Sequence, residues 1–265
     1  LKPPVLAYKN SVAPSGSTGR FVTNFYAGGV PPAATAPSPG LNGEALTSYS
    51  GQIPFQNPAS GNAHLAGVSG SVYGAGLGCS VMLCDRLWHN SSISVTTTTE
   101  QAITSPTWPA RDRNGSTNGD GVYVAIEVSS ATGNAGLITN TTLNYTNSAG
   151  TSGRTGTMTA GFPITGPAGL IVPFELQSGD VGIRSVQGLT LGTSYVSGTI
   201  HLIAYRPLAH WFATFDDFMT EFLADGISVG FPRLYNNTVP FWMFISQTTN
   251  NQTNSSGVTL QITHG

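Results

Sequence analysis

Between about residue 66 and residue 206, apolar and β-branched residues come in short runs that alternate with polar residues. Gly, Asn and Ser bound these runs, as is typical of strands with one buried face. They read SGSVYG, CSVMLCDRLW, SISVTTTTEQAI, GVYVAIEVSS, TTLNYT, GTMTAG, LIVPFEL, VQGLTLG and SGTIHLIAYRPL. Because no helix pattern separates them, we predict a mainly β chain, an antiparallel jelly-roll-like β-sandwich, and not a parallel α/β sheet.

One segment breaks this alternation. Residues 207–226 read PLAHWFATFDDFMTEFLADG, in which apolar residues stand three and four positions apart. Pro207 suits the first turn of a helix and Gly226 its end. The spacing predicts one amphipathic helix with a buried apolar stripe. The stripe consists of Leu208, Trp211, Phe212, Phe215, Phe218, Met219, Phe222 and Leu223.

Residues 1–62 have a different composition, in which Pro and Gly recur too often for helices or central strands. Aromatic residues such as Phe21, Phe25 and Tyr26 are scattered through them. A fully disordered tail would hold fewer, so we expect an extended arm that orders against the chain's own body or a neighbouring subunit. The predicted division is an arm over 1–62 and a β-sandwich body over 63–265, which includes the helix at 207–226 and the C-terminal strands.

Charge is scarce along the whole chain. Charged residues make up 8% of it and the formal net charge is -2. Such a chain has no long-range field to attract nucleic acid or an anionic membrane, so we expect neither as a partner. No apolar stretch approaches the roughly 20 residues that cross a bilayer. No lysine follows Lys9, and a body whose cations are all arginine fits buried or subunit-facing surfaces.

Cys79 and Cys84 stand five residues apart on one extended stretch. At roughly 3.3 Å per residue they are about 16 Å apart, too far to form a disulfide with each other. We expect reduced, buried thiols, which fit assembly in a cytosol.

The stretch PARDRNGSTNGDGVYVAIEV, residues 109–128, resembles the start of a calcium loop because Asp112, Asn114 and Ser116 alternate. The pattern then fails, because the sixth position is Thr117 where Gly is needed and the twelfth is Tyr123 where Glu is needed. Its Asn-Gly and Asp-Gly pairs are turn dipeptides. We therefore predict a structural loop between two strands.

Other sites for metals, cofactors or nucleophiles lack local support. The five histidines, His64, His89, His201, His210 and His264, form no HxxxH or HxH pair, whereas zinc requires several converging ligands. Gly74, Gly76 and Gly78 are spaced more tightly than the dinucleotide-binding fingerprint and lie outside any βαβ unit. There is no GxSxG nucleophile elbow. We predict no catalytic residue, no cofactor and no metal site.

A pair of carboxylates in a cleft would suit glycoside hydrolysis. The candidates are Glu100, Glu127, Glu175 and Asp180. In a chain with so few charges, ion pairs at loop corners or interfaces are the simpler interpretation. The pairs suggested by sequence proximity are Asp85 with Arg86, Asp112 with its neighbours Arg111 and Arg113, and Asp180 with Arg184.

Several phrases taken together resemble virion structural proteins of tailed bacteriophages. They are CDRLWHNSSISVTTTTEQ, PARDRNGSTNGDGVYVAIEV, NYTNSAGTSGRTGTM, LQSGDVGIRSVQGLTLGTSYVSGTIHLIAYRPLA and GFPRLYNNTVPF, which cover roughly residues 65–265. The resemblance implies a head-associated protein without enzyme activity, located in the virion and assembled in the cytoplasm of a host bacterium. A major capsid protein of the usual fold would show a long spine helix, so an auxiliary protein that decorates or cements the head fits better.

The implied partners are other virion proteins, above all the major capsid protein, and further copies of the chain. The predicted interface residues are Phe21, Phe25, Tyr26, Trp211, Phe212, Phe215, Trp242 and Phe244. The alternatives are a major capsid or tail component, a tail-associated hydrolase, and a receptor- or glycan-binding virion module. The last of these predicts an exposed aromatic platform, for which Trp88, Trp108 and Tyr123 are candidates.

Overall fold

The computed structural model describes residues 4–10, 19–73, 79–213, 219–246 and 255–265. The chain forms two compact units. Unit 1 combines Leu1–Thr35, Thr47–Asp85 and Pro207–Gly265, and unit 2 combines Ala36–Leu46 with Arg86–Arg206. These units do not follow the predicted boundary at residue 62, because both contain residues of the predicted arm.

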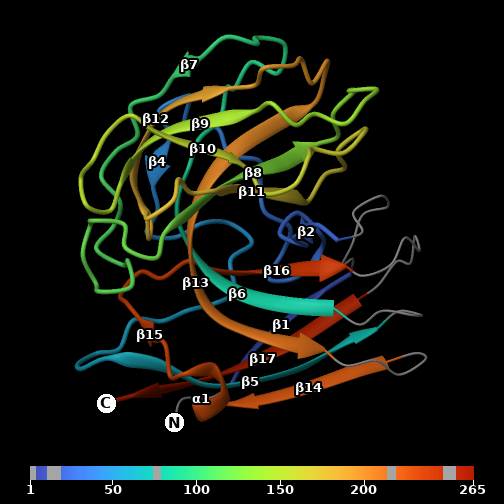
Figure 1. Cartoon of the computed structure of the whole chain (residues 1–265). Helices are drawn as coiled ribbons and strands as arrows, with labels where there is room; N and C mark the ends of the chain where they lie inside the picture. Colours follow the sequence, from blue (N-terminus) through green and yellow to red (C-terminus); the bar gives the residue numbers. More distant parts are fainter. Residues whose placement is uncertain (1–3, 11–18, 74–78, 214–218, 247–254) are drawn as a thin grey trace. The chain divides into compact units, whose positions relative to one another are not determined.

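Unit 1 contains a six-stranded antiparallel sheet with the strand order β14-β5-β17-β1-β3, to which β15 adds by pairing with β5 (Figure 1). Their bounds are β1 (Val5–Lys9), β3 (Gly29–Val30), β5 (Ala63–Tyr73), β14 (Met219–Asp225), β15 (Arg233–Leu234) and β17 (Ser255–His264). Five residues of the predicted arm thus form β1, which pairs with β17 from Val5↔Leu260 to Lys9↔Ser256.

A second layer of unit 1 is built on β16 (Pro240–Ser246), which pairs with β2 (Phe21–Val22) and with β6 (Cys79–His89). Buried residues from both layers form one cluster, so the two sheets pack as a sandwich. From the first sheet come Ala7, Leu65, Val68, Val258, Leu260 and Ile262, and from the second layer Val22, Val81, Leu83, Trp242 and Phe244.

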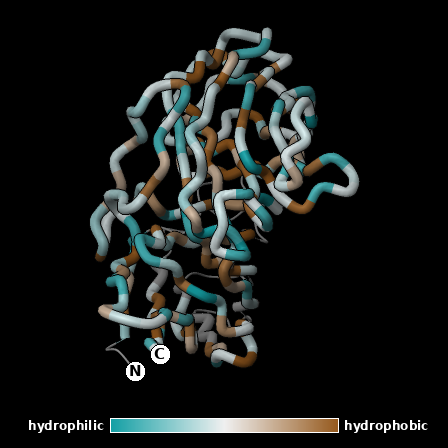
Figure 2. The backbone as a smooth tube through the Cα atoms, turned by 90° about the vertical axis from the view of Figure 1, so that its left-hand side faces the viewer, coloured by the Kyte–Doolittle hydropathy of each residue, from teal (hydrophilic) through white to brown (hydrophobic). Residues whose placement is uncertain are grey.

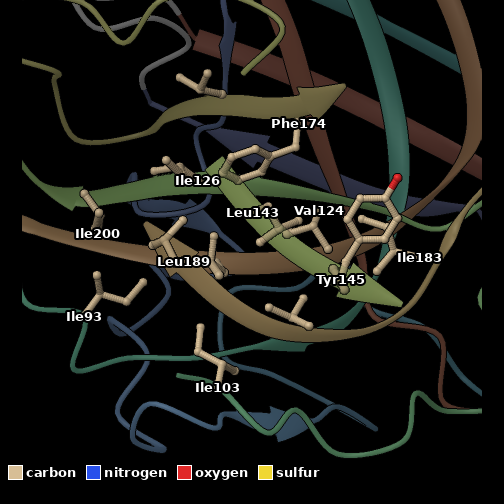
Figure 3. Packing of buried hydrophobic residues seen from close by; sticks show 14 of the residues in the cluster. Ile93, Ile103, Val124, Ile126, Leu143, Tyr145, Phe174, Ile183, Leu189 and Ile200 are labelled. Atoms are coloured by element: carbon tan, nitrogen blue, oxygen red, sulfur yellow. The ribbon is translucent and has the colours of Figure 1, made fainter. Parts of the chain in front are cut away.

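Unit 2 is built on antiparallel strands in the order β13-β8-β11-β10-β9-β12-β7. Their bounds are β7 (Gln101–Ala102), β8 (Tyr123–Ser130), β9 (Thr142–Asn147), β10 (Arg154–Met158), β11 (Leu170–Glu175), β12 (Ile183–Thr190) and β13 (Thr199–Ala213). The short β4 (Glu44–Ala45) pairs with the end of β6. Figure 3 shows Val124, Ile126, Leu143 and Phe174 packed together in the core of this unit.

The prediction of a mainly β, antiparallel fold is confirmed. Along the backbone tube of Figure 2, hydrophobic and hydrophilic residues alternate over short distances. The helix predicted at 207–226 is wrong. β13 runs on to Ala213, and Met219–Asp225 is the strand β14. The described helix is the short α1 (Gly226–Val229), which Asp225 caps by accepting a hydrogen bond from Ser228 N. Residues 214–218 lie outside the described residues.

Pairing between strands outweighs the helical spacing in this segment. β14 pairs with β5 over its full length, from Met219↔Tyr73 to Asp225↔Gly67. An amphipathic pattern gives only a weak preference, which the backbone hydrogen bonds of a sheet override. Within the described residues, no helix is long and apolar enough to span a membrane.

Candidate interaction surface

A row of directly paired residues crosses four strands of the six-stranded sheet. Leu6 on β1 pairs with Thr259 on β17, Thr259 pairs with Ser69 on β5, and Ser69 pairs with Leu223 on β14. Residues that pair directly project from the same face of a sheet. Leu6 is 61% exposed and Leu223 is 79% exposed, so this face points away from the core of unit 1.

A parallel row lies two residues further along the strands. Tyr8 pairs with Val30 on one side and with Gly257 on the other, and Gly257 pairs with Ser71. Tyr8 and Val30 are exposed. The first row therefore has a leucine at each flank. The second row has Tyr8 and Val30 at one flank and ends at Glu221 of β14, which pairs with Ser71. Small residues lie at the centre of both rows. We call these eight residues the outward face, namely Leu6, Tyr8, Val30, Ser69, Ser71, Leu223, Gly257 and Thr259.

Between the flanks the outward face is hollowed. The hollow has a volume of about 600 Å³ and is lined by Leu6, Ser69, Gly70, Ser71, Leu223, Gly257 and Thr259. A second hollow of about 350 Å³ shares Leu6 with it and is lined by Pro4, Val5, Leu6, Pro54, Gln56, Ile262 and His264. The larger lining holds no charged side chain, so an apolar partner would displace water without stripping an ion of its hydration.

The one cation on β1 is turned away from this surface. Lys9 is 3% exposed, and its Nζ donates to the carbonyl oxygens of Ala27, at 3.1 Å, and Pro32, at 2.9 Å. Burial lowers the pKa of Lys9 to about 8. Strand alternation therefore leaves only Leu6 and Tyr8 of this segment prominent on the outside.

Most of the predicted interface residues lie inside unit 1. Phe25, Trp211, Trp242 and Phe244 are buried, and the last three belong to the unit's core cluster. Trp242 is also held by hydrogen bonds, since its indole donates to Asn24 and its carbonyl accepts from Thr23 Oγ1 at 2.9 Å. Phe21 and Tyr26 are half-buried. The side chain of Phe212 and the whole of Phe215 lie outside the described part of the chain, and the interface role of the eight residues stays a prediction.

Sequence reasoning missed the outward face for two reasons. The alternation in VLAYK was assigned to an arm, so Leu6 and Tyr8 were not recognised as outward residues of a strand. Leu223 was assigned to a buried helical stripe, and in the structure it is one of the most exposed apolar side chains. The usable signal was the period of two in VLAYK, whereas MTEFLAD shows no such alternation.

The 109–128 stretch contains a loop held by one carboxylate. Asp112 accepts hydrogen bonds from Asn114 N at 2.9 Å, Ser116 N at 2.7 Å, Ser116 Oγ at 2.6 Å and Asp120 N at 3.1 Å. Burial alone would raise the pKa of Asp112, but these hydrogen bonds outweigh it and hold the pKa below its usual value. Among the described residues no group of side chains is arranged to hold a metal ion. The carboxylate that resembled a calcium ligand organises the loop.

The candidate carboxylates are bound in separate places. Glu127 is fully buried and forms a bidentate pair with Arg86. Asp180 accepts from Arg154 Nε at 2.9 Å and from the Tyr145 hydroxyl at 2.6 Å. The predicted pairing of Asp180 with Arg184 is therefore wrong.

Asp85 accepts from the backbone of Val239, and Arg86 binds Glu127. Glu100 accepts a long hydrogen bond of 3.3 Å from Asn144, and Glu175 is exposed at the end of β11.

Two histidines belong to the buried polar interior of unit 2. His89 Nε2 lies 3.1 Å from Glu44 Oε1, and because a carboxylate only accepts, this nitrogen carries the hydrogen. Burial lowers the pKa of His89 to about 2, and the positive charge of Arg86 acts in the same direction. His201 Nδ1 donates to Asn90 O at 2.9 Å, and its pKa is also lowered, first by burial. Both rings are neutral hydrogen-bonding groups at neutral pH.

The tryptophans proposed for a glycan platform do not form one. Trp88 and Trp108 are buried with ring centroids 5.3 Å apart. Their indole nitrogens donate to Asn42 O at 3.1 Å and to Ile183 O at 2.8 Å, so both rings are structural parts of unit 2. Tyr123 is half-buried beside Tyr205. Cys84 is a buried free thiol, as expected, and the side chain of Cys79 lies outside the described part.

No protein-family model and no curated protein matches the chain. Among solved structures, it is similar to that of the infectious bursal disease virus Gx strain, with 9% identity and a TM-score of 0.19 over 98% of this chain and 79% of the other. The VP2 subviral particle of infectious bursal disease virus gives 11% identity and a TM-score of 0.17, with 97% and 79% covered. TM-scores this low do not indicate a shared fold.

Proposed function

We propose that the chain is a structural virion protein that decorates or cements a phage head, and that the outward face contacts a neighbouring subunit. The observation that carries this is the cross-strand row from Leu6 to Leu223, which holds exposed leucines at both ends and no charge between them. Large exposed apolar side chains gathered on one sheet face favour an interaction site, and the hydroxyl and glycine positions between them carry no charge.

Burial of the apolar residues of this face supplies the driving force for the contact. Covering one exposed leucine stabilises a contact by about 1.5–3 kcal/mol. The face offers Leu6, Tyr8, Val30 and Leu223. A symmetric shell repeats each weak contact many times, so the assembly is stable although a single contact is not.

The partners we propose are the major capsid protein and further copies of the chain, within a virion assembled in the host bacterial cytoplasm. The phrases that resemble tailed-phage virion proteins support this assignment, and the low overall charge fits a protein that is covered by neighbours. We propose no enzyme activity. Supporting this, Glu127 and Asp180 use their carboxylates in ion pairs with Arg86 and Arg154.

The test is cryo-electron microscopy of purified particles that carry either the wild-type chain or Leu223→Glu. Leu137→Glu is the matched control, because Leu137 is also an exposed leucine, at 58%, and belongs to unit 2. We expect symmetric copies on the head with the outward face covered, a loss of at least about ten-fold in occupancy for Leu223→Glu, and wild-type occupancy for Leu137→Glu.

The same experiment separates the alternatives. A few copies confined to the tail, or shell subunits formed by the chain alone, would replace the decoration assignment. An outward face open to solvent in every copy, with equal occupancy for both variants, would overturn the proposed contact.

A further inference from the structure

A polar hollow lies in unit 2 among β9, β12 and the loops before β8. It has a volume of about 360 Å³. Five of its lining side chains are hydroxyls and one is a cation, and it contains no carboxylate. The six are Ser105, Thr107, Thr117, Thr146, Arg184 and Ser185. Gly150 completes the lining.

The hydroxyls are held by neighbouring groups so that two of them keep a free hydrogen. Ser105 Oγ accepts from Val186 N at 2.9 Å, and Ser185 Oγ accepts from Gln187 Nε2 at 2.7 Å. A hydroxyl that accepts in this way still has its own O–H to donate. Thr146 Oγ1 donates to Gln187 Oε1 at 3.1 Å and retains acceptor capacity. The hollow therefore offers fixed donors and an acceptor side by side.

Arg184 brings the only charge of the lining. Within the described part of the chain Arg184 makes no hydrogen bond or ion pair. Asp180, the carboxylate nearest to it in sequence, is bound by Arg154, Tyr145 and Asn147 instead. An arginine has five N–H donors in a planar fork that matches a carboxylate. Its free guanidinium beside the hydroxyl donors is complementary to one negative charge.

We propose that this hollow binds a sugar that carries a carboxylate. The carboxylate is bound by Arg184 and the serine hydroxyls, because these groups are donors and no acidic side chain opposes them. The sugar's own hydroxyls pair with the threonines, which both donate and accept. Its volume lies at the lower end of the range for small-molecule sites, which suits a monosaccharide better than a long chain. This inference is independent of the proposed structural role.

The test is isothermal titration calorimetry of the whole chain with glucuronic acid, glucose and acetate. We expect saturable, salt-sensitive binding of glucuronate, with glucose and acetate each at least about ten-fold weaker. Arg184→Gln should weaken glucuronate by at least about ten-fold, because a charge-assisted contact is lost. Arg233→Gln, which removes an exposed arginine of unit 1, should bind as the wild type does.

Thr107→Val tests the sugar part separately. Thr107 is exposed, so the loss of its hydroxyl leaves the fold intact, and we expect weaker glucuronate binding without a change for acetate. Acetate binding as tightly as glucuronate would overturn the assignment to a sugar. Equal binding of glucose, unchanged binding by Arg184→Gln, or no saturable binding of glucuronate at millimolar concentration would overturn the site.

Discussion

Arg86 and Glu127 face each other inside unit 2 as a bidentate pair, with Nη1···Oε1 at 2.7 Å and Nη2···Oε2 at 2.8 Å, and neither side chain is exposed. Arg86 lies on β6, and Glu127 lies on β8 opposite His201 of β13. Removing two charges from water costs so much that only their mutual neutralisation makes the arrangement tolerable. The pair therefore ties these strands to one another.

Removal of one member of this pair should destabilise the protein strongly. Glu127→Gln leaves the guanidinium of Arg86 buried without its counter-charge, and we expect the free energy of unfolding to fall by about 3–5 kcal/mol. Urea unfolding followed by tryptophan fluorescence measures it, since Trp88 and Trp108 are buried in the same unit.

Glu175→Gln is the control for that variant, because Glu175 is an exposed strand glutamate and should lose less than about 0.5 kcal/mol. The double variant Arg86→Met/Glu127→Leu should recover a large part of the stability, because it removes both charges. A double variant no more stable than Glu127→Gln would contradict the charge argument.

His89 should make the fold sensitive to mild acid. Its folded pKa of about 2 lies below the ordinary value of 6.5, so between these values the unfolded chain binds a proton that the folded chain does not. Its contribution to stability is complete above pH 6.5 and declines as the pH falls toward 2. We expect a loss of about 2 kcal/mol between pH 7 and pH 5, measured by urea unfolding at each pH. His201 acts in the same direction.

The matched variants for this pH dependence are His89→Gln and His264→Gln. The first should flatten the loss between pH 7 and pH 5, and the second, which alters a half-buried histidine of unit 1, should leave it unchanged. A profile that keeps its full slope in His89→Gln would assign the acid sensitivity to other groups.

Asp112→Ala should loosen the loop over residues 113–120. The variant removes the acceptor for three backbone N–H groups and one hydroxyl, which we expect to cost about 2 kcal/mol and to expose the loop to proteolysis. Asp120→Ala is the control, since the Asp120 side chain accepts one exposed hydrogen bond, from Asn114. Limited proteolysis with mass spectrometry locates the cut, and equal cleavage of both variants would count against the central role of Asp112.

Calcium should leave the melting temperature unchanged. The oxygens of Asp112 already accept four hydrogen bonds from within the loop, so a cation would have to displace them. Differential scanning calorimetry with added calcium and with chelator checks this. A calcium-specific rise in melting temperature would show binding to the folded state.

The strand pattern of unit 2 was predictable because its period of two coincides with burial. In β9, the run TLNYTN alternates half-buried and buried residues and places Leu143 and Tyr145 in the core, as alternation requires. The segment after Pro207 was not predictable in this way, because its aromatic residues satisfy helical and strand spacing at once. Its pairing with β5, about 150 residues away in sequence, decided the outcome.

The candidate sites were less predictable than the fold. Asp180 and Arg184 are four residues apart, and sequence proximity suggested a pair, whereas the partner of Asp180 comes from β10, where Arg154 stands. Cross-strand neighbours depend on register, which the sequence of one strand does not contain. In the six-stranded sheet, strand register likewise aligns Leu6 with Leu223 across four strands. Local sequence patterns therefore identified neither the unpaired state of Arg184 nor the outward face.

Gly119 should tolerate no side chain, for a reason separable from its backbone conformation. Its φ of +80° favours glycine, and a Cβ would also meet the carbonyl of Ile183. Gly179 has a similar φ of +88° with no atom within 4 Å of a Cβ. We expect Gly179→Ala to cost about 1–2 kcal/mol from conformation alone and Gly119→Ala about 3 kcal/mol or more, measured by urea unfolding. The excess arises because the Ile183 carbonyl accepts from Trp108 Nε1 at 2.8 Å, so moving it away from the new methyl group disturbs a buried hydrogen bond. If both variants lost the same free energy of unfolding, the backbone at Ile183, the first residue of β12, would be able to move away from the new methyl group without cost.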